Sequence, residues 1–196
     1  MSEWSKYYAK GTDTDLYIRN LYGQREFLAE IIATEGKKIL EVGAGTGTMS
    51  IFLSQLGLKV TTLDNDRAVL EGAKEAQQKF GGHNQIVEGD AFQLPFPDNS
   101  FDLIFHQGLL EHFTDAEIHQ LLNEQLRVAP TVILSVPNAN YPHQDFGNER
   151  LLGRRAWEKI LQPYQIVMSR DYALKIFPKW YLWRVPIQYM ARIVRK

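Results

Sequence analysis

The stretch KILEVGAGTGTMS, from residue 38 to residue 50, constrains the fold more than any other part of the chain. It begins as an apolar run suited to a buried parallel strand, passes through three glycines spaced two apart, and continues into a helical pattern of apolar residues. Because glycine has no Cβ, such a loop turns tightly and approaches a ligand closely. Unpaired N–H groups at the start of the helix point at that ligand. The stretch therefore predicts a nucleotide-type site.

Glycine spacing and one carboxylate separate this loop from a dinucleotide site. The dinucleotide fingerprint is GxGxxG, whereas residues 43–48 read GAGTGT, so the third glycine comes one position early. Glu41 lies two residues before the first glycine, where it would repel a pyrophosphate but could receive a cationic group. A nicotinamide site and a tight packing turn are the alternatives at this point.

With this motif the chain resembles the class I S-adenosylmethionine-dependent methyltransferases, whose first motif reads E/DxGxGxG after the first strand. The stretch from Gly89 through LPFPDNSFDLI closely resembles the type 11 small-molecule methyltransferase group. The resemblance covers residues 37–137 well and both ends poorly. It implies the cofactor S-adenosyl-L-methionine, with Glu41 at the methionine portion. The implied glycine-loop residues are Gly43, Ala44, Gly45 and Gly47.

Further cofactor contacts are expected where the second, third and fourth strands end. Asp64, followed by Asn65, lies 19 residues beyond Gly45, about where a carboxylate can accept hydrogen bonds from ribose hydroxyls. The resemblance implies that Asp90 accepts from the adenine amino group and that the adjacent Ala91 and Phe92 meet the ring, ordinary core packing being the alternative for Phe92. It also implies contacts to the methionine end from the residues that close the fourth strand, His106 and Gln107.

Alternating strand and helix patterns predict an α/β fold, a three-layer αβα sandwich with a Rossmann-like, mostly parallel sheet. The expected strands include residues 58–63, 84–88, 101–106, 131–136 and 164–168, and a helix is expected between residues 13 and 36. The sequence leaves undecided whether the seventh strand of the family is present, because the last residues contain Pro178 and Pro186 and only one alternating run, Tyr181 to Val185. We expect one domain, with an N-terminal helical segment (1–36), a cofactor-binding core (37–137) and a substrate loop with a basic aromatic region (138–196).

A few residues are candidates for acting on, enclosing or selecting the molecule that accepts the methyl group. His112 and His143 are candidate general bases because imidazole titrates near neutral pH, and a structural histidine is the alternative for His112. Tyr7, Tyr8 and Tyr17 are lid candidates, since an N-terminal segment often lies across the ligand in the resembled family; packing of the helix on the sheet is the alternative. The 17-residue loop 137–153 is expected to select the substrate.

Composition excludes several classes of protein. The 196 residues contain no cysteine, which excludes disulfides, cysteine metal sites and cysteine nucleophiles. No apolar run reaches the length of a membrane span and the N-terminus lacks an apolar signal core, so a cytoplasmic protein is expected.

The C-terminal quarter is basic, whereas the rest is acidic. Residues 147–196 hold 11 Lys and Arg against 3 Asp and Glu, and residues 1–146 hold 11 against 20. The last 22 residues combine six basic side chains with several aromatic ones, a composition that suits peripheral membrane contact. Nucleic-acid binding is not expected, because no recognised nucleic-acid-binding motif accompanies the charge. The alternative is a tail that packs on its own domain, and the sequence gives no indication of oligomeric state.

The function that we expect is methyl transfer from S-adenosylmethionine to a small-molecule or lipid-like acceptor. An NAD-dependent oxidoreductase would use the same Asp64 but requires pyrophosphate at the glycine loop, against the spacing and against Glu41. A non-catalytic module that binds S-adenosylmethionine would share the site and show no turnover. No cofactor other than S-adenosylmethionine and no metal is expected.

Overall fold

The computed structural model describes residues 3–176 and 184–196. The aromatic residues Phe177, Trp180, Tyr181 and Trp183, and most of the run predicted at 181–185, lie outside the described residues. Of the helices that the structure describes, none combines the length and apolar character that crossing a bilayer requires.

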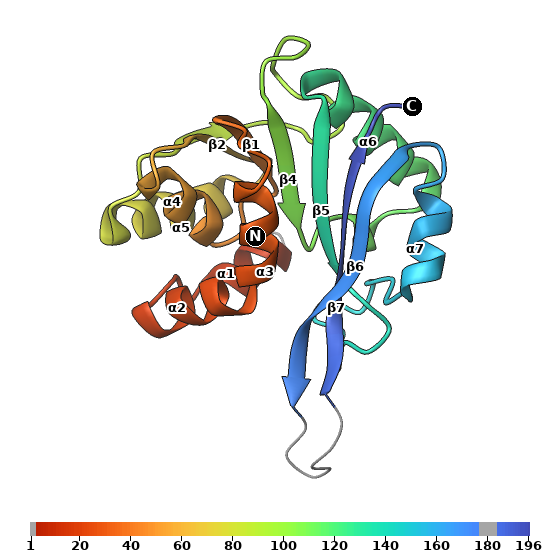
Figure 1. The fold of residues 1–196 in the computed structure, drawn as a ribbon. Helices are drawn as coiled ribbons and strands as arrows, with labels where there is room; N and C mark the ends of the chain where they lie inside the picture. The colour runs from red at the N-terminus through yellow and green to blue at the C-terminus, as the bar shows by residue number, and fades with distance from the viewer. Residues whose placement is uncertain (1–2, 177–183) are drawn as a thin grey trace.

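A seven-stranded sheet in the order β3-β2-β1-β4-β5-β7-β6 forms the centre of the molecule (Figure 1). The strands are β1 Lys38–Val42, β2 Lys59–Asp64, β3 Gln85–Glu88, β4 Leu103–Gln107, β5 Thr131–Pro137, β6 Gln165–Ile176 and β7 Arg184–Val194. The helices are α1 Glu3–Tyr8, α2 Thr14–Gly23, α3 Arg25–Ile32, α4 Thr48–Gln55, α5 Arg67–Phe80, the 3-10 turn η1 Leu110–His112, α6 Asp115–Val128 and α7 Arg154–Ile160.

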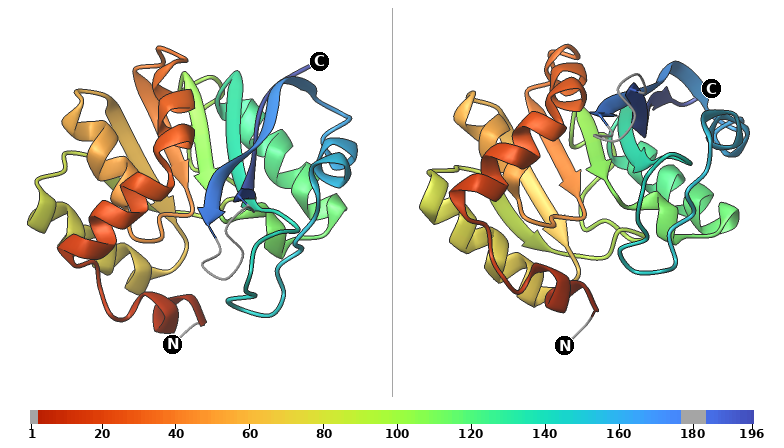
Figure 2. Two further views of the ribbon diagram at one scale, coloured as in Figure 1. Left: turned by 60° about the horizontal axis from the view of Figure 1, so that its bottom comes forward. Right: turned by 90° about the horizontal axis from the view of Figure 1, so that it is seen from below.

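Helices cover both faces of this sheet (Figure 2). One face packs on α6 and α7, through residues that include Leu121 and Trp157, and the other packs on α3 and α4, through residues that include Phe27 and Leu53. Strand residues alternate between the two sides, as in β4, where Ile104 joins the first cluster and Phe105 joins the second. The predicted three-layer sandwich is confirmed.

The seventh strand, which the sequence left open, is present and antiparallel. β7 pairs with β5 and with β6, antiparallel in both cases, while β1 to β5 pair in parallel. Pro186 fits because the register of β5 on β7 ends at the pair Pro137 and Gln188, so the proline lies beyond that doubly paired region. A proline without an N–H is tolerated where a strand is paired on one side only.

Local signals set the helix ends. The Asp66 carboxylate accepts from the N–H groups of Ala68 and Val69 at the start of α5, and Gly81 ends that helix in a left-handed conformation. Thr114 and Glu117 form the predicted capping box of α6. The prediction of a single helix between residues 13 and 36 was wrong in one respect. It is two helices, separated at Gln24, directly after a glycine that lowers helix propensity.

The chain order of the strands reverses between β1 and β4. At such a switch point the connections leave in opposite directions and open a crevice at the carboxyl ends of the strands. The glycine loop, which joins β1 to α4, lies at this edge of the sheet. The topology alone therefore places the predicted ligand loop beside the ends of β2 and β4.

Gly47 and Gly57 offer a matched test of why the third glycine of the loop is needed. Both have a positive φ, +68° and +85°, but a Cβ at Gly47 would lie 3.3 Å from the Cβ of Ala73 on α5, whereas nothing lies within 4 Å at Gly57. We expect Gly57→Ala to lower the free energy of unfolding by about 1 kcal/mol, the left-handed strain alone, and Gly47→Ala to lower it by about 2 kcal/mol. Denaturant unfolding of both variants measures the difference; equal losses would contradict a packing role for Gly47.

Candidate active site

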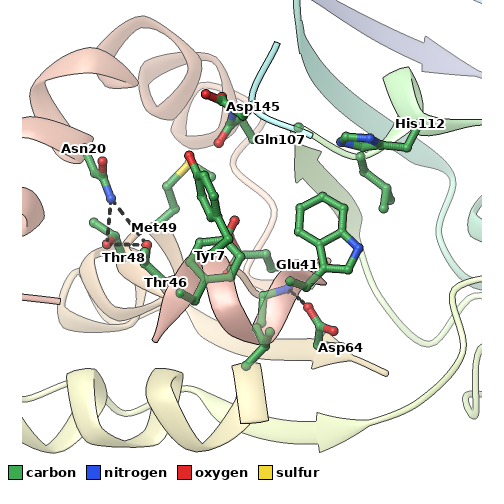
Figure 3. A pocket seen from close by; sticks show the side chains of 18 of the residues that line it. Tyr7, Asn20, Glu41, Thr46, Thr48, Met49, Asp64, Gln107, His112 and Asp145 are labelled. Carbon is green, nitrogen blue, oxygen red and sulfur yellow. Dashed lines mark hydrogen bonds between the residues drawn. The ribbon is translucent and has the colours of Figure 1, made fainter. Parts of the chain in front are cut away.

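One cavity of about 560 Å³ opens at the carboxyl ends of the strands (Figure 3). Its walls come from the glycine loop, the end of β2, the β4–η1 segment, the loop after β5, and α1 with α2. The volume falls within the range of about 300–1,000 Å³ that small-molecule sites occupy. Segments far apart in the sequence therefore converge on one site at the predicted edge of the sheet.

The glycine loop forms the floor through Gly43, Ala44 and Gly45. Gly43 and Gly45 have φ values of +81° and +49°, a conformation that favours glycine. A Cβ at Gly45 would lie 3.0 Å from the Tyr8 hydroxyl, so the ring of α1 reaches the loop only because this position has no side chain. Behind the loop, the Asn20 amide of α2 donates to the hydroxyls of Thr46 and Thr48 and ties the helix to it.

Glu41, at the end of β1, is a buried carboxyl group on the cavity wall. The Ser50 hydroxyl of α4 donates a hydrogen bond to its Oε2. Burial raises the pKa of Glu41 to about 8, because removal from water disfavours the charged form more than the Ser50 hydrogen bond favours it. A cationic ligand group would stabilise the ionised form of this carboxyl.

Asp64, at the end of β2, lines the cavity next to Asn65. Its Oδ2 accepts from the N–H of Ala44 at 2.9 Å and its Oδ1 from the N–H of Asp66 at 3.0 Å. Burial raises its pKa, and the backbone hydrogen bonds oppose that shift. Because a carboxylate has about four lone-pair positions, Asp64 keeps the capacity to accept from a ligand.

Aromatic side chains of α1 meet the loop that follows β5. The Phe146 ring lies 4.2 Å from the Trp4 ring and 4.9 Å from the Tyr7 ring, measured between centroids. Trp4 also contacts the ring of His112 edge-on at 4.9 Å. Trp4, Tyr7, Phe146 and His112 all line the cavity, so these contacts form a wall between the ligand space and water.

His112 is held in one orientation. Its Nδ1 lies 2.8 Å from Oδ1 of Asn148, and an amide oxygen can only accept, which assigns the proton to Nδ1. In the neutral ring Nε2 is then the nitrogen that can accept a proton, and it lies 4.0 Å from Oε1 of Glu111. The predicted base therefore lies in the cavity, beside a carboxyl group that the sequence did not single out.

Glu111 is that carboxyl group, 3% exposed and on the cavity wall. Within residues 3–176 and 184–196 its Oε2 has no hydrogen-bond donor. Burial, with a smaller contribution from the charge of Glu149, raises the pKa of Glu111 to about 8. Glu149 itself accepts from the N–H groups of Phe146 and Gly147, at 2.6 and 3.0 Å, so this second carboxylate orders the loop that carries Phe146.

Of the other predicted cofactor residues, Ala91 and Gln107 line the cavity, whereas Gly47, Asp90, Phe92 and His106 do not. Gly47 packs against α5. Asp90 is exposed and its Oδ1 accepts from the N–H of Phe92, and the Phe92 ring packs on Phe113. His106 is fully buried on β4, because its side chain follows the strand alternation into the core.

Two other predicted residues lie apart from the cavity. His143 is exposed on the loop after β5, next to Tyr141, and lines no part of it. Tyr17 is a packing residue, because its ring stacks on Phe80 with 4.1 Å between centroids. Tyr7 and Tyr8, the other lid candidates, do line the cavity.

Several lining residues had no sequence signal of their own. Glu111 is part of the LEHF segment, where His112 drew attention first. Asn20, Thr48 and Gln188 come from α2, α4 and β7, and only the fold brings them to the glycine loop or to the end of β5. Tyr141, Asp145 and Phe146 belong to the loop that was expected to select the substrate.

The pKa of Glu41 predicts how stability varies with pH. A carboxyl group whose pKa is about 8 when folded, against an ordinary 4.5, binds more protons in the folded state between these values. The contribution of Glu41 to the free energy of unfolding is therefore fully present below pH 4.5 and is lost as the pH rises through 8. Glu41→Gln cannot ionise, so we expect it to be more stable than the wild type above pH 8, by about 1 kcal/mol or more, and equal near pH 4.5.

Denaturant unfolding across this pH range measures the effect. Glu75→Gln, on the exposed surface of α5, serves as the control and should follow the wild type throughout. Parallel curves for the wild type and Glu41→Gln would contradict the raised pKa.

Comparison with known proteins bears on this site. Residues 39–130 match the model of the methyltransferase domain family. Over 116 residues the chain is 35% identical to a demethylmenaquinone methyltransferase of Renibacterium salmoninarum. This aligned region covers 59% of the chain and 46% of that protein. The chain spans about half the length of the curated relatives it matches.

Solved structures share the fold over nearly the whole chain. The PH0226 protein of Pyrococcus horikoshii OT3 superposes with a TM-score of 0.74 at 18% identity and covers 100% of both chains. Magnesium protoporphyrin IX methyltransferase of Synechocystis PCC 6803, solved with bound S-adenosylhomocysteine, superposes with a TM-score of 0.67 at 19% identity, over 98% of this chain and 93% of that one. The match over residues 39–130, with the GxGxG loop and Glu41, makes the chain similar to the class I S-adenosylmethionine-dependent methyltransferases, and the solved structures share its fold.

Proposed function

We propose that this protein transfers a methyl group from S-adenosylmethionine to a small-molecule acceptor. The observation that carries the proposal is the pair of carboxyl groups, Glu41 and Asp64, at the ends of adjacent parallel strands beside a GxGxG loop. Two carboxyl groups suit a ligand with a cationic part and with hydroxyl donors. Glu41 does not suit the pyrophosphate of a nicotinamide cofactor, which its carboxylate would repel.

The residues of the cavity fit S-adenosylmethionine in an ordered way. Glu41 and Gln107 would hold the methionine portion, Asp64 and Asn65 the ribose, and the chain at Gly89 and Ala91 the adenine. When bound, the cofactor supplies an electrophilic methyl group on a sulfonium. The protein's part is to hold the cofactor through these groups and to orient the acceptor.

The walls of the cavity would exclude water and handle the acceptor's proton. The contacts of Trp4 and Tyr7 with Phe146 close one side, which supports a lid role for the N-terminal segment. Nε2 of His112, with its proton assigned to Nδ1, is placed to take a proton from an acceptor that carries one. His143 lies outside the cavity and has no part in this proposal.

Acceptor class and cellular setting are proposals that draw on the relatives. The demethylmenaquinone methyltransferase of Renibacterium salmoninarum acts, by its name, on demethylmenaquinone, a lipid-like molecule. Membrane contact through the basic tail remains a prediction, since most of the aromatic residues of that tail lie outside the described residues. In the part described, Tyr189 is buried and Arg192 pairs with Glu30, so these two pack on the protein itself. A cytoplasmic location also remains a prediction.

Calorimetric titration with S-adenosylhomocysteine tests the cofactor. We expect micromolar binding to the wild type and, in Asp64→Ala, a loss of about 10- to 100-fold, because charge-assisted hydrogen bonds to the ribose are removed. Glu75→Ala, an exposed substitution on α5, should bind like the wild type. NAD should not bind.

Three outcomes would contradict the proposal. No binding of S-adenosylhomocysteine, or preferential binding of NAD, would exclude the cofactor site as described. Binding with no methyl transfer to any of a broad set of amines, phenols, quinols and carboxylic acids would favour a non-catalytic binding module.

A further inference from the structure

The acceptor side of the cavity is unusually rich in carboxyl groups. Besides Glu41 and Asp64, which the cofactor would use, Glu111, Asp145 and Glu149 line the same space. Lys10 and His112 are the only basic side chains among the described lining residues. The nearby guanidinium of Arg150 binds the Phe113 carbonyl and Asp115 instead, so it does not neutralise this group.

Two buried oxygen atoms of residues that line the cavity lack a donor. Oε2 of Glu111, on η1, and Oε1 of Gln188, on β7, find no hydrogen-bond partner among the described residues, and their side chains are 3% and 6% exposed. Both residues line the cavity. Buried acceptors are almost always satisfied, so an occupant that brings N–H donors is what these two positions require.

We propose that the acceptor subsite between Glu111, Gln188 and Asp145 binds a protonated alkylamine, whose nitrogen is the atom to be methylated. The inference rests on the proposed methyl transfer and names its substrate class. A neutral acceptor without donors would leave both buried oxygens unsatisfied, and an anionic acceptor would be repelled by Asp145 and Glu149. An ammonium group supplies three donors and a positive charge.

The same residues supply the proton chemistry that an amine needs. An ammonium nitrogen has no lone pair, so it must lose a proton before it can accept a methyl group. In that step an N–H bond of the ammonium breaks, its electron pair stays on nitrogen, and the proton forms an O–H bond with the Glu111 carboxylate. The product is a neutral amine beside a neutral carboxylic acid, so charge balances. The raised pKa of Glu111, about 8, suits a group that exchanges a proton near neutral pH.

Aromatic rings complete a surface for the amine's carbon chain. Tyr7, Tyr141 and Phe146 line the cavity near Asp145, whose Oδ2 lies 3.5 Å from the Tyr141 hydroxyl. Figure 3 shows Asp145 and Tyr7 among the side chains that surround the space. The faces of aromatic rings attract cations, so such rings favour an ammonium group over a carboxylate. Ring faces and carboxyl groups therefore select for the same charge.

Calorimetry with ligands matched in shape but not in charge tests the proposal. The probes are 2-phenylethylamine and n-hexylamine, compared with 2-phenylethanol and 1-hexanol and with phenylacetate and hexanoate. Each is titrated into the wild type with and without S-adenosylhomocysteine. We expect both amines to bind at least about 10-fold more tightly than the alcohols, the gain of a charge-assisted hydrogen bond, and the acids not to bind.

Variants assign the preference to the proposed residues. Glu111→Gln keeps the size of the side chain, and we expect it to weaken amine binding about 10-fold or more while the alcohols bind as before. Gln188→Ala should weaken the amines to a smaller degree. Glu75→Gln, exposed on α5, removes the same charge away from the cavity and should change nothing.

The outcomes separate this inference from the proposed function. Alcohols or acids that bind as tightly as the amines, amines that do not bind, or unchanged amine binding by Glu111→Gln would overturn the inference. Loss of S-adenosylhomocysteine binding with retained amine binding would instead count against the cofactor and leave the amine subsite in place.

Discussion

The left-handed backbone of the glycine loop is the constraint on which the rest of the structure depends. Gly43, Gly45 and Gly47 all have positive φ, so the chain leaves β1, turns within a few residues and enters α4. The turn lets the N–H of Gly43 donate to the carbonyl of Leu63 on β2, which joins the loop to the neighbouring strand. It also leaves room for Tyr8 over Gly45. One local conformation thus fixes the end of a strand, the start of a helix and the closeness of the N-terminal segment.

The carboxyl groups around this loop differ in how they are satisfied. Glu41 has the Ser50 hydroxyl, and Asp64 has two backbone N–H groups, so each is stable with only part of its accepting capacity used. Oε2 of Glu111 has no donor among the described residues. A buried acceptor without a donor costs about 1–3 kcal/mol, so the protein bears that cost at Glu111 unless a ligand relieves it. Glu111, which lacks a donor, is therefore more informative about the substrate than Glu41 and Asp64, which have donors.

Much of the fold and the glycine-loop side of the cavity could be predicted from the sequence, because short-range signals determine them. The motif at residues 41–47 identifies the loop, and Asp64, at the end of β2, lies beside that loop because β2 pairs in parallel with β1. The buried position of His106 was not predictable in this way. A polar residue at the end of a strand faces either the crevice or the core, and the two differ by a single residue in register. Asp90 shows the same limit, since an acidic residue in a turn can bind its own backbone, as it does here.

The acceptor side was less predictable because its contacts join segments that lie far apart in the chain. Phe146 meets Trp4 and Tyr7 only after the loop beyond β5 has been ordered, and that order comes from Glu149, which binds the backbone N–H groups of Phe146 and Gly147. The same carboxylate adds negative charge beside Glu111. Loop order and the charge that meets the acceptor are thus coupled through one residue that does not belong to the cofactor motif. We therefore expect substitutions in this loop to change which acceptor is chosen while Glu41, Asp64 and the glycine loop stay as they are.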